Sequence, residues 1–354
     1  MRTGQYGWQR CWGAKSKWTP EHLASKALEP LIHKYDIVAT DALEQLDKIS
    51  PPPYSITPHQ VRVEDGEGAT KPDDEKKAHR NLYGAVGEYA PKNEKIGKLW
   101  TEVNTIPDWV DWGQIERGQK VFYRYGGAII TTLTFVSLLG GMGSGRTTTQ
   151  HILNATRDLE SIKPGGDGFV NSVQVRLLHA AVRRRIMQMA ELRPEYYDVG
   201  RYGVPINDFD SLGTISTFSA AVETVDYLAL WRYIAYLVGA PHDWMSTPAS
   251  AKRMMESLLV SEIRPTRTSA TLANNIITGL QGQAPTYASR EFMCAETYWL
   301  NGRELSQALG IERPPLYYSA LVLGQCMLFM AMGYLNRSVP CLDERNINVS
   351  WISF

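Results

Sequence analysis

The chain has 354 residues, of which 44% are hydrophobic and 21% charged, a composition typical of a globular protein with a sizeable core. Its 37 Lys and Arg residues balance its 37 Asp and Glu residues, so the basic surface that nucleic-acid binding needs is not expected. The four cysteines show no CxxC spacing, which predicts free thiols in a reducing compartment. The first eight residues lack the apolar core of a signal peptide, so we expect a cytoplasmic protein, peripheral at most to an internal membrane.

The N-terminal part is rich in Trp and Pro and contains one amphipathic stretch, residues 22–46. Three consecutive prolines at 51–53 stop it, because proline cannot continue a helix. Residues 62–80 carry many charges and few apolar side chains, which predicts a solvated loop.

Helical patterns follow from residue 114 onward. We expect helices over residues 114–122, 128–139, 147–162, a stretch around His179 that ends near 192, one that starts near 208, one that ends at 239, and 247–260, 267–281, 288–309 and 315–336. A Pro-Gly-Gly-Asp-Gly turn separates the third from the fourth. No sustained period-two alternation is found, so the sequence predicts an all-α protein.

Two uncharged runs, residues 125–145 and 314–336, are long enough to span a bilayer. The first contains six glycines and several threonines, and the second contains tyrosines, a serine and a glutamine. A helix buried on all sides of a large helical protein gives the same pattern. We therefore expect both runs to be core helices, with membrane contact as the alternative.

The most informative feature is His179, which Arg176 precedes by three residues and Arg183 follows by four. These spacings place the three side chains on one helix face. Two neighbouring cations disfavour a protonated imidazole, so His179 is suited to be a neutral metal ligand beside an anion. A haem offers this combination, an iron atom and two propionates. The alternative is a core histidine between ion-paired or solvated arginines.

Other candidates are weaker. His151 lies on the preceding predicted helix, but nothing around it specifies a metal, and no HExxH or ExxH arrangement is present. The glycine-rich stretch 143–146 lacks the Gly-Lys-Ser/Thr ending of a phosphate-binding loop.

Five short motifs, taken in order, carry a resemblance to a known family. They are Arg146-Thr147-Thr148-Thr149, Val175-Arg176-Leu177-Leu178-His179-Ala180-Ala181-Val182-Arg183, Tyr202-Gly203-Val204-Pro205-Ile206-Asn207, Trp231-Arg232-Tyr233 and Asn301-Gly302-Arg303-Glu304-Leu305. Over about residues 115–312, the chain resembles the oxygenases that include the latex-clearing rubber oxygenases and the fungal MpaB-type oxygenases.

This resemblance implies a globin-like helical core, with additional helices, that holds haem b. His179 matches the family's proximal iron ligand, and Arg176 and Arg183 match basic residues near the haem. The MpaB-type members carry an N-terminal membrane anchor, which we do not find in this sequence.

The resemblance also implies a distal pocket that departs from the rubber-cleaving members. Thr149 matches a threonine of that pocket, while Thr148 stands where those members have a lysine. Their distal arginine falls near Gly145, with Arg146 as the nearest substitute. We therefore do not expect polyisoprene cleavage, and we assign Arg146, Thr148 and Thr149 to catalysis as a hypothesis.

These observations predict a haem b-dependent oxygenase that uses dioxygen to oxidise a lipophilic small molecule, terpenoid or polyketide-like, in a setting such as fungal secondary metabolism. The alternatives are a non-catalytic protein that binds haem or an apolar ligand, and a redox-neutral isomerase on the same fold. We expect residues 1–113 to form an N-terminal extension, 114–312 the haem-binding domain, and 313–354 a C-terminal helix and tail that complete it.

Overall fold

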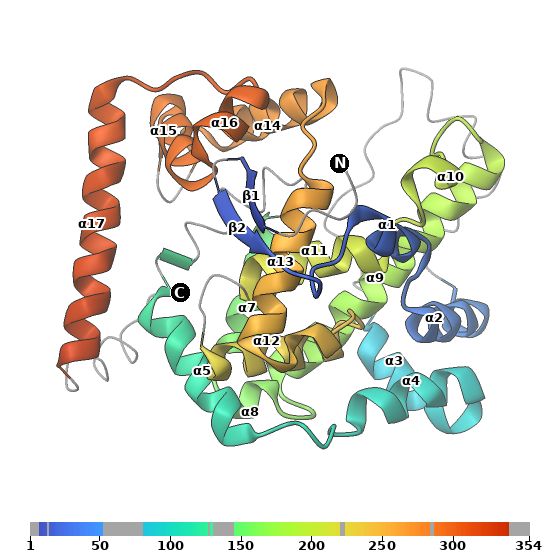
Figure 1. Ribbon diagram of the computed structural model, residues 1–354. Helices are drawn as coiled ribbons and strands as arrows, with labels where there is room; N and C mark the ends of the chain where they lie inside the picture. The colour runs from blue at the N-terminus through green and yellow to red at the C-terminus, as the bar shows by residue number, and fades with distance from the viewer. Residues whose placement is uncertain are drawn as a thin grey trace.

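The structure is a computed structural model, and it describes residues 7–12, 14–51, 81–126, 128–129, 145–219, 224–283 and 287–339. Helices dominate these residues (Figure 1), so the prediction of an all-α protein is confirmed. The only sheet within these ranges is a small antiparallel hairpin of two strands, which pairs Gly7 with Trp18 and Cys11 with Ala14.

The N-terminal part is less regular than its amphipathic pattern predicted. Its elements are β1 (Gly7–Cys11), β2 (Ala14–Trp18), α1 (Ser25–Leu28), the 3-10 helix η1 (Glu29–His33), α2 (Ile37–Ile49), α3 (Leu82–Tyr89), the 3-10 helix η4 (Ala90–Lys92) and α4 (Glu94–Asn104). The stretch 22–46 is broken because the 3-10 turn η1, whose second residue is Pro30, follows α1. Asp36 then caps α2 and accepts a hydrogen bond from the backbone of Ala39.

The central helices lie close to their predicted positions. They are α5 (Trp112–Arg124), α7 (Gly145–Thr156), α8 (Leu159–Ile162), α9 (Asp167–Leu192), α10 (Val199–Tyr202), α11 (Asp208–Ser219) and α12 (Val225–Leu237). The helix predicted over 147–162 is two helices, because the Asp158 side chain accepts a hydrogen bond from the backbone of Ser161 and starts α8. Most of the predicted helix 128–139 lies outside the described residues.

The C-terminal part contains the 3-10 helix η5 (Asp243–Ser246), α13 (Pro248–Glu262), α14 (Arg267–Leu280), α15 (Arg290–Leu300), α16 (Gly302–Ala308) and α17 (Leu316–Ser338). Thr247 and Thr266 begin α13 and α14 with capping boxes. The single helix predicted over 288–309 is interrupted at Asn301 and Gly302, where the glycine takes a φ of 77°.

The main hydrophobic core is built around α12, α5 and α9, with α9 crossing the middle of the molecule (Figure 1). α12 and α5 approach closely at Gly118, where a Cβ would lie 2.4 Å from the carbonyl oxygen of Asp226. This core also takes in Ala39, Leu43 and Leu99, so it extends on both sides of residue 113. A separate cluster lies between α14, α15 and α16. The division of the chain into domains stays a prediction.

The expectation that residues 314–336 form a buried core helix is wrong. α17 stands at the edge of the molecule (Figure 1), and only 11% of its most apolar stretch is buried. Its main neighbour is α15, which covers one side only. Among the described residues, α17 is the one helix long and apolar enough to cross a membrane. The other uncharged run, 125–145, lies mostly outside the described residues.

Glu296 on α15 gives a test of this packing. Its carboxyl group is buried and accepts a hydrogen bond of 3.0 Å from Gln325 of α17, and burial raises its pKa to about 7. Because the folded state holds this proton more tightly than the unfolded chain, the free energy of unfolding should fall as pH rises from about 4.5 through about 7.

Glu296→Gln removes the ionising group and keeps a polar partner for Gln325, so it should abolish this pH dependence and stabilise the protein by roughly 3 kcal/mol at pH 8. Urea unfolding of both proteins at pH 5 and pH 8 measures this change in the free energy of unfolding. Glu88→Gln, an exposed change on α3, should keep the wild-type dependence. Equal pH profiles for wild type and Glu296→Gln would contradict the assignment.

Candidate functional site

α9 carries the candidate site and buries one face along most of its length. The residues of this face recur at spacings of three and four. They are Gly168, Phe169, Ser172, Val173, Arg176, Leu177, Ala180 and Arg183. Gly168 brings α9 against α7, because a Cβ there would lie 2.5 Å from the carbonyl oxygen of Asn154. The two helices that the sequence predicted on either side of the 164–168 turn are therefore packed together.

His179 lies at the margin of this buried face with a half-buried imidazole. Its pKa is lowered to about 4, first by burial and then by the charge of Arg183, while Asp36 acts in the opposite direction. The imidazole is therefore neutral at pH 7, as the two arginines predicted, although burial is the larger cause. Among the residues that the structure describes, none forms a hydrogen bond with its ring.

The surface next to His179 is apolar and open. Leu178 is 47% exposed and Val182 is 38% exposed, although both lie in the middle of α9. A neutral nitrogen base beside uncovered apolar side chains is suited to a flat, largely apolar ligand that needs one axial nitrogen.

Arg176 is occupied by two carboxylates. Its Nε and Nη2 atoms bind Asp36 at 2.6 and 3.0 Å, and Nη2 also binds Glu102 at 2.7 Å. The side chain is 3% exposed, so this is a buried ion-pair network. Only Nη1 has no partner among the described residues. The predicted contact with a haem propionate stays a prediction, and it would depend on this one nitrogen.

Arg183 is held by neutral groups. It donates to the carbonyl oxygens of Pro205 and Ile206 at 3.1 and 2.6 Å and to the Thr40 hydroxyl at 3.0 Å, and it lies over the ring of Tyr35. No carboxylate forms an ion pair with it within the described part of the chain. Its charge therefore remains available to act on His179. Its predicted contact with a propionate also stays a prediction.

His151 on α7 is a candidate that sequence reasoning passed over. It is buried, and its Nδ1 lies 3.0 Å from Oδ1 of Asn171 on α9. An amide oxygen can only accept, so Nδ1 carries the proton and Nε2 keeps a lone pair. Burial lowers its pKa to about 4, the Asn171 hydrogen bond opposes this, and His179 lowers it further. The two imidazoles therefore lie within electrostatic reach of each other.

The predicted distal residues lie at the start of α7. α7 spans Gly145–Thr156, so Arg146, Thr148 and Thr149 lie inside it. Their side chains lie outside what the structure describes. Thr148 precedes His151 by three residues, and this spacing places both on one side of the helix.

The residues around His179 fit a haem better than a metal ion bound by protein ligands alone. Among the described residues, no three His, Cys, Asp or Glu side chains gather into a group that would hold a metal ion. A haem supplies four nitrogens to its iron and needs only one or two from the protein. The neutral, half-buried imidazole of His179, free of hydrogen bonds to described residues, meets that need.

Arg176→Met tests the ion-pair network without haem. It should lower the free energy of unfolding of the haem-free protein by about 3–5 kcal/mol, because it leaves two carboxylates without their cation. Arg185→Met, an exposed change on the same helix, should cost less than about 0.5 kcal/mol. Denaturant titration gives both values. If the two variants were equally stable, the network would not hold α9 in place.

Comparisons with known proteins identify the family and the fold of the chain. The family model described as "ER-bound oxygenase mpaB/B'/Rubber oxygenase, catalytic domain" matches residues 139–329. A rubber oxygenase of Streptomyces sp. (strain K30) is 23% identical over an alignment of 256 positions, which covers 60% of this chain and 59% of that protein. The match thus spans less than two thirds of this relative.

A solved structure of latex clearing protein in the closed state is also similar. It aligns over 98% of this chain and 95% of its own with a TM-score of 0.54 and 15% sequence identity, which shows a shared fold. The matched family segment contains α7, α9 and His179 and covers more than half of the chain. The chain therefore belongs to the family of mpaB-type and rubber oxygenase catalytic domains.

Proposed function

We propose that this protein is a haem b-dependent oxygenase that oxidises a lipophilic small molecule. The observation that carries the proposal is His179, a neutral imidazole without a hydrogen bond to any described residue, next to the uncovered side chains of Leu178 and Val182. Membership in an oxygenase family supports the reaction class. The cofactor is inferred from the imidazole and its surroundings.

In this proposal His179 would bind the haem iron, and α9 holds His179 in place. Arg176 ties α9 to Asp36 before α2 and to Glu102 on α4, and Arg183 ties it to Thr40 and to the loop at 205–206. The charge of Arg183 also keeps the imidazole unprotonated, which a ligand nitrogen requires. Haem, when bound, would supply the activation of dioxygen.

The residues of α7 would serve the opposite side of the site. Thr148 and Thr149 would offer hydroxyl groups and Arg146 a guanidinium group, which would orient dioxygen or a polar group of the substrate. His151 would hold a lone pair on Nε2 near the same helix face, since Asn171 fixes the proton on Nδ1.

The substrate in this proposal is a terpenoid or polyketide-like molecule, and a fungal biosynthetic pathway is a setting that fits it. The relative from Streptomyces is by name a rubber oxygenase. We do not propose rubber as the substrate of this chain, because Thr148 replaces the lysine that the resemblance leads us to expect there. The exposed Leu178 and Val182 favour an apolar substrate.

His179→Ala tests the ligand. The variant should keep its helix, because alanine is the best helix former, and should lose haem. The haem-to-protein ratio and the visible spectrum after purification from haem-replete cells measure this. His33→Ala, which removes an exposed histidine, is the matched control and should retain haem. Full haem occupancy with an unchanged spectrum in His179→Ala would refute the assignment. Haem-loaded wild-type protein that consumes no dioxygen with any terpenoid or polyketide substrate offered would favour a non-catalytic binding protein.

Thr148→Lys tests the role proposed for α7 on the side of the site opposite His179. A threonine hydroxyl is a poor iron ligand, so the wild-type resting iron should be five-coordinate or bound to water. An amine at 148 should shift the spectrum toward a six-coordinate form bound by nitrogen, and more so at high pH, because only the unprotonated amine binds iron. Spectra recorded across a pH series measure this. Spectra that match wild type at every pH would assign the distal role to Arg146 or Thr149 instead.

A further inference from the structure

α17 is attached to the body of the protein along one face. Gln325 donates to Oε1 of the buried Glu296 at 3.0 Å, and the indole of Trp299 donates to the carbonyl oxygen of Ser319 at 3.2 Å. Near the other end, Gly333 lies against the ring of Tyr125, and a Cβ there would sit 2.9 Å from Cε1 of that ring. These contacts fix the rotation of α17 about its axis.

The attached face holds most of the polar side chains of the helix. Counting about 100° per residue, Ser319, Gln325 and Asn336 fall on the same side as Val322 and Gly333, which are buried. A helix on the surface of a soluble protein normally shows the reverse order, with its polar side chains toward water.

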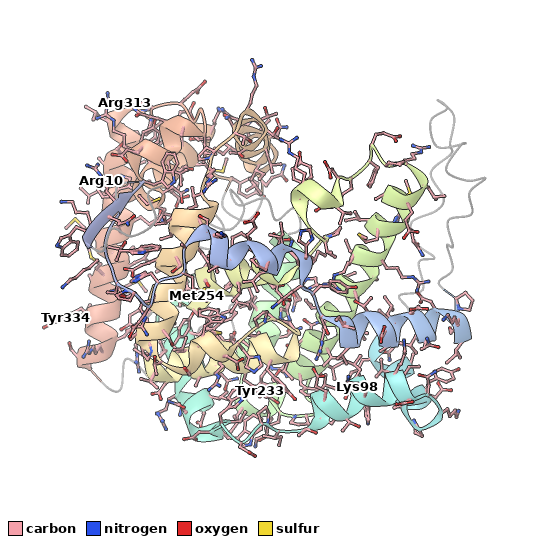
Figure 2. All side chains as sticks on the ribbon, turned by 45° about the vertical axis from the view of Figure 1, so that its right-hand side comes forward. Arg10, Lys98, Tyr233, Met254, Arg313 and Tyr334 are labelled. Carbon is pink, nitrogen blue, oxygen red and sulfur yellow. The ribbon has the colours of Figure 1, made fainter. Side chains whose placement is uncertain are left out.

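The opposite face is apolar and covers more than half of the circumference. Its exposed residues are Leu316, Tyr317, Leu321, Leu323, Met327, Leu328, Met330, Met332, Tyr334 and Leu335. Charge is confined to the ends of the helix, with Glu312 and Arg313 just before it and Arg337 in its last turn. Figure 2 shows Arg313 and Tyr334 at opposite ends of α17.

We propose that this outer face of α17, defined by the ten residues above, lies in the surface of a lipid bilayer, with the helix parallel to the membrane and the protein body on the water side. Its 23 residues form an apolar strip about 35 Å long, with a tyrosine and an arginine at each end to reach the headgroups. The proposal is independent of the oxygenase activity.

The observations favour a bilayer over a second copy of the chain. A partner helix needs only a narrow seam of apolar residues, and it would leave much of this wide face uncovered. They also favour a helix that lies flat over one that crosses the bilayer. α17 contacts the body from Ser319 to Gly333, about 21 Å of its length, so a crossing helix would draw the polar body into the hydrocarbon.

The test is flotation of the full-length protein with vesicles of phosphatidylcholine, with and without 30% phosphatidylserine. Wild type should float with both and somewhat more with the anionic vesicles, because Arg337 gives one end of the helix a positive charge, whereas Glu312 offsets Arg313 at the other end. Met327→Glu/Met330→Glu places two charges on the outer face at positions where side chains are exposed, and should weaken binding by roughly ten-fold or more.

Leu192→Glu/Tyr196→Glu is the matched control. It adds the same two charges at apolar positions that are similarly exposed but far from α17 along the chain, and it should float like wild type. Thermal melting should show that both double variants remain folded. Washing with alkaline carbonate should release bound wild type, as expected of a helix that lies in the surface.

Three kinds of result would overturn the proposal. The first is a failed flotation test, in which wild type stays unbound or the α17 double variant binds as strongly as wild type. The second is a dimer by light scattering that the double variant converts to a monomer, which would assign the outer face to a second copy. The third is resistance to alkaline carbonate, which would show a helix that crosses the bilayer.

Discussion

The buried contact of Arg176 with Asp36 and Glu102 is the interaction on which the site depends. It joins three parts of the chain that are far apart in sequence, because Arg176 is separated by 140 residues from Asp36 and by 74 from Glu102. Asp36 also caps α2, so one carboxylate both starts a helix and anchors α9. Such a network is costly to bury and is tolerated only when each charge has its partners.

The end of α12 closes over this network at Gly239. A Cβ there would lie 2.3 Å from Oδ2 of Asp36 and 2.6 Å from Nε of Arg176, and the residue takes a φ of 72°. Both the close approach and the left-handed backbone require glycine. Gly239, where the sequence predicted that a helix ends, is therefore also the residue that lets α12 cover the ion pairs, and through them it stabilises the helix that carries His179.

The two arginines that bracket His179 differ in their electrostatic effect. Arg176 is neutralised by carboxylates, whereas Arg183 is held by carbonyl and hydroxyl oxygens and keeps its charge. Burial is the main reason why the pKa of His179 is lowered, and Arg183 is the arginine whose charge lowers it further. Polar contacts also fix the orientation of α17. The hydrogen bonds at Gln325 and at the carbonyl oxygen of Ser319 turn its apolar face outward.

The sequence by itself determined the helical class and the position of α9, and it placed Arg183 one turn from His179, where its charge acts on the imidazole. These properties depend on local spacing, since residues three and four apart share a face wherever the helix is placed. The positions of α11, α13 and α14 followed from the same periodicity and from their caps. Breaks within helices, such as the one at Asp158, were missed because a single cap decides them.

Only the tertiary structure decided which residues form ion pairs and hydrogen bonds with the side chains of the site. Asp36, Glu102 and Asn171 cannot be assigned to Arg176 and His151 from spacing, because they come from other helices. The environment of α17 was also misjudged for a physical reason. An apolar run shows that a helix avoids water, but whether protein or lipid covers it depends on which elements pack against it.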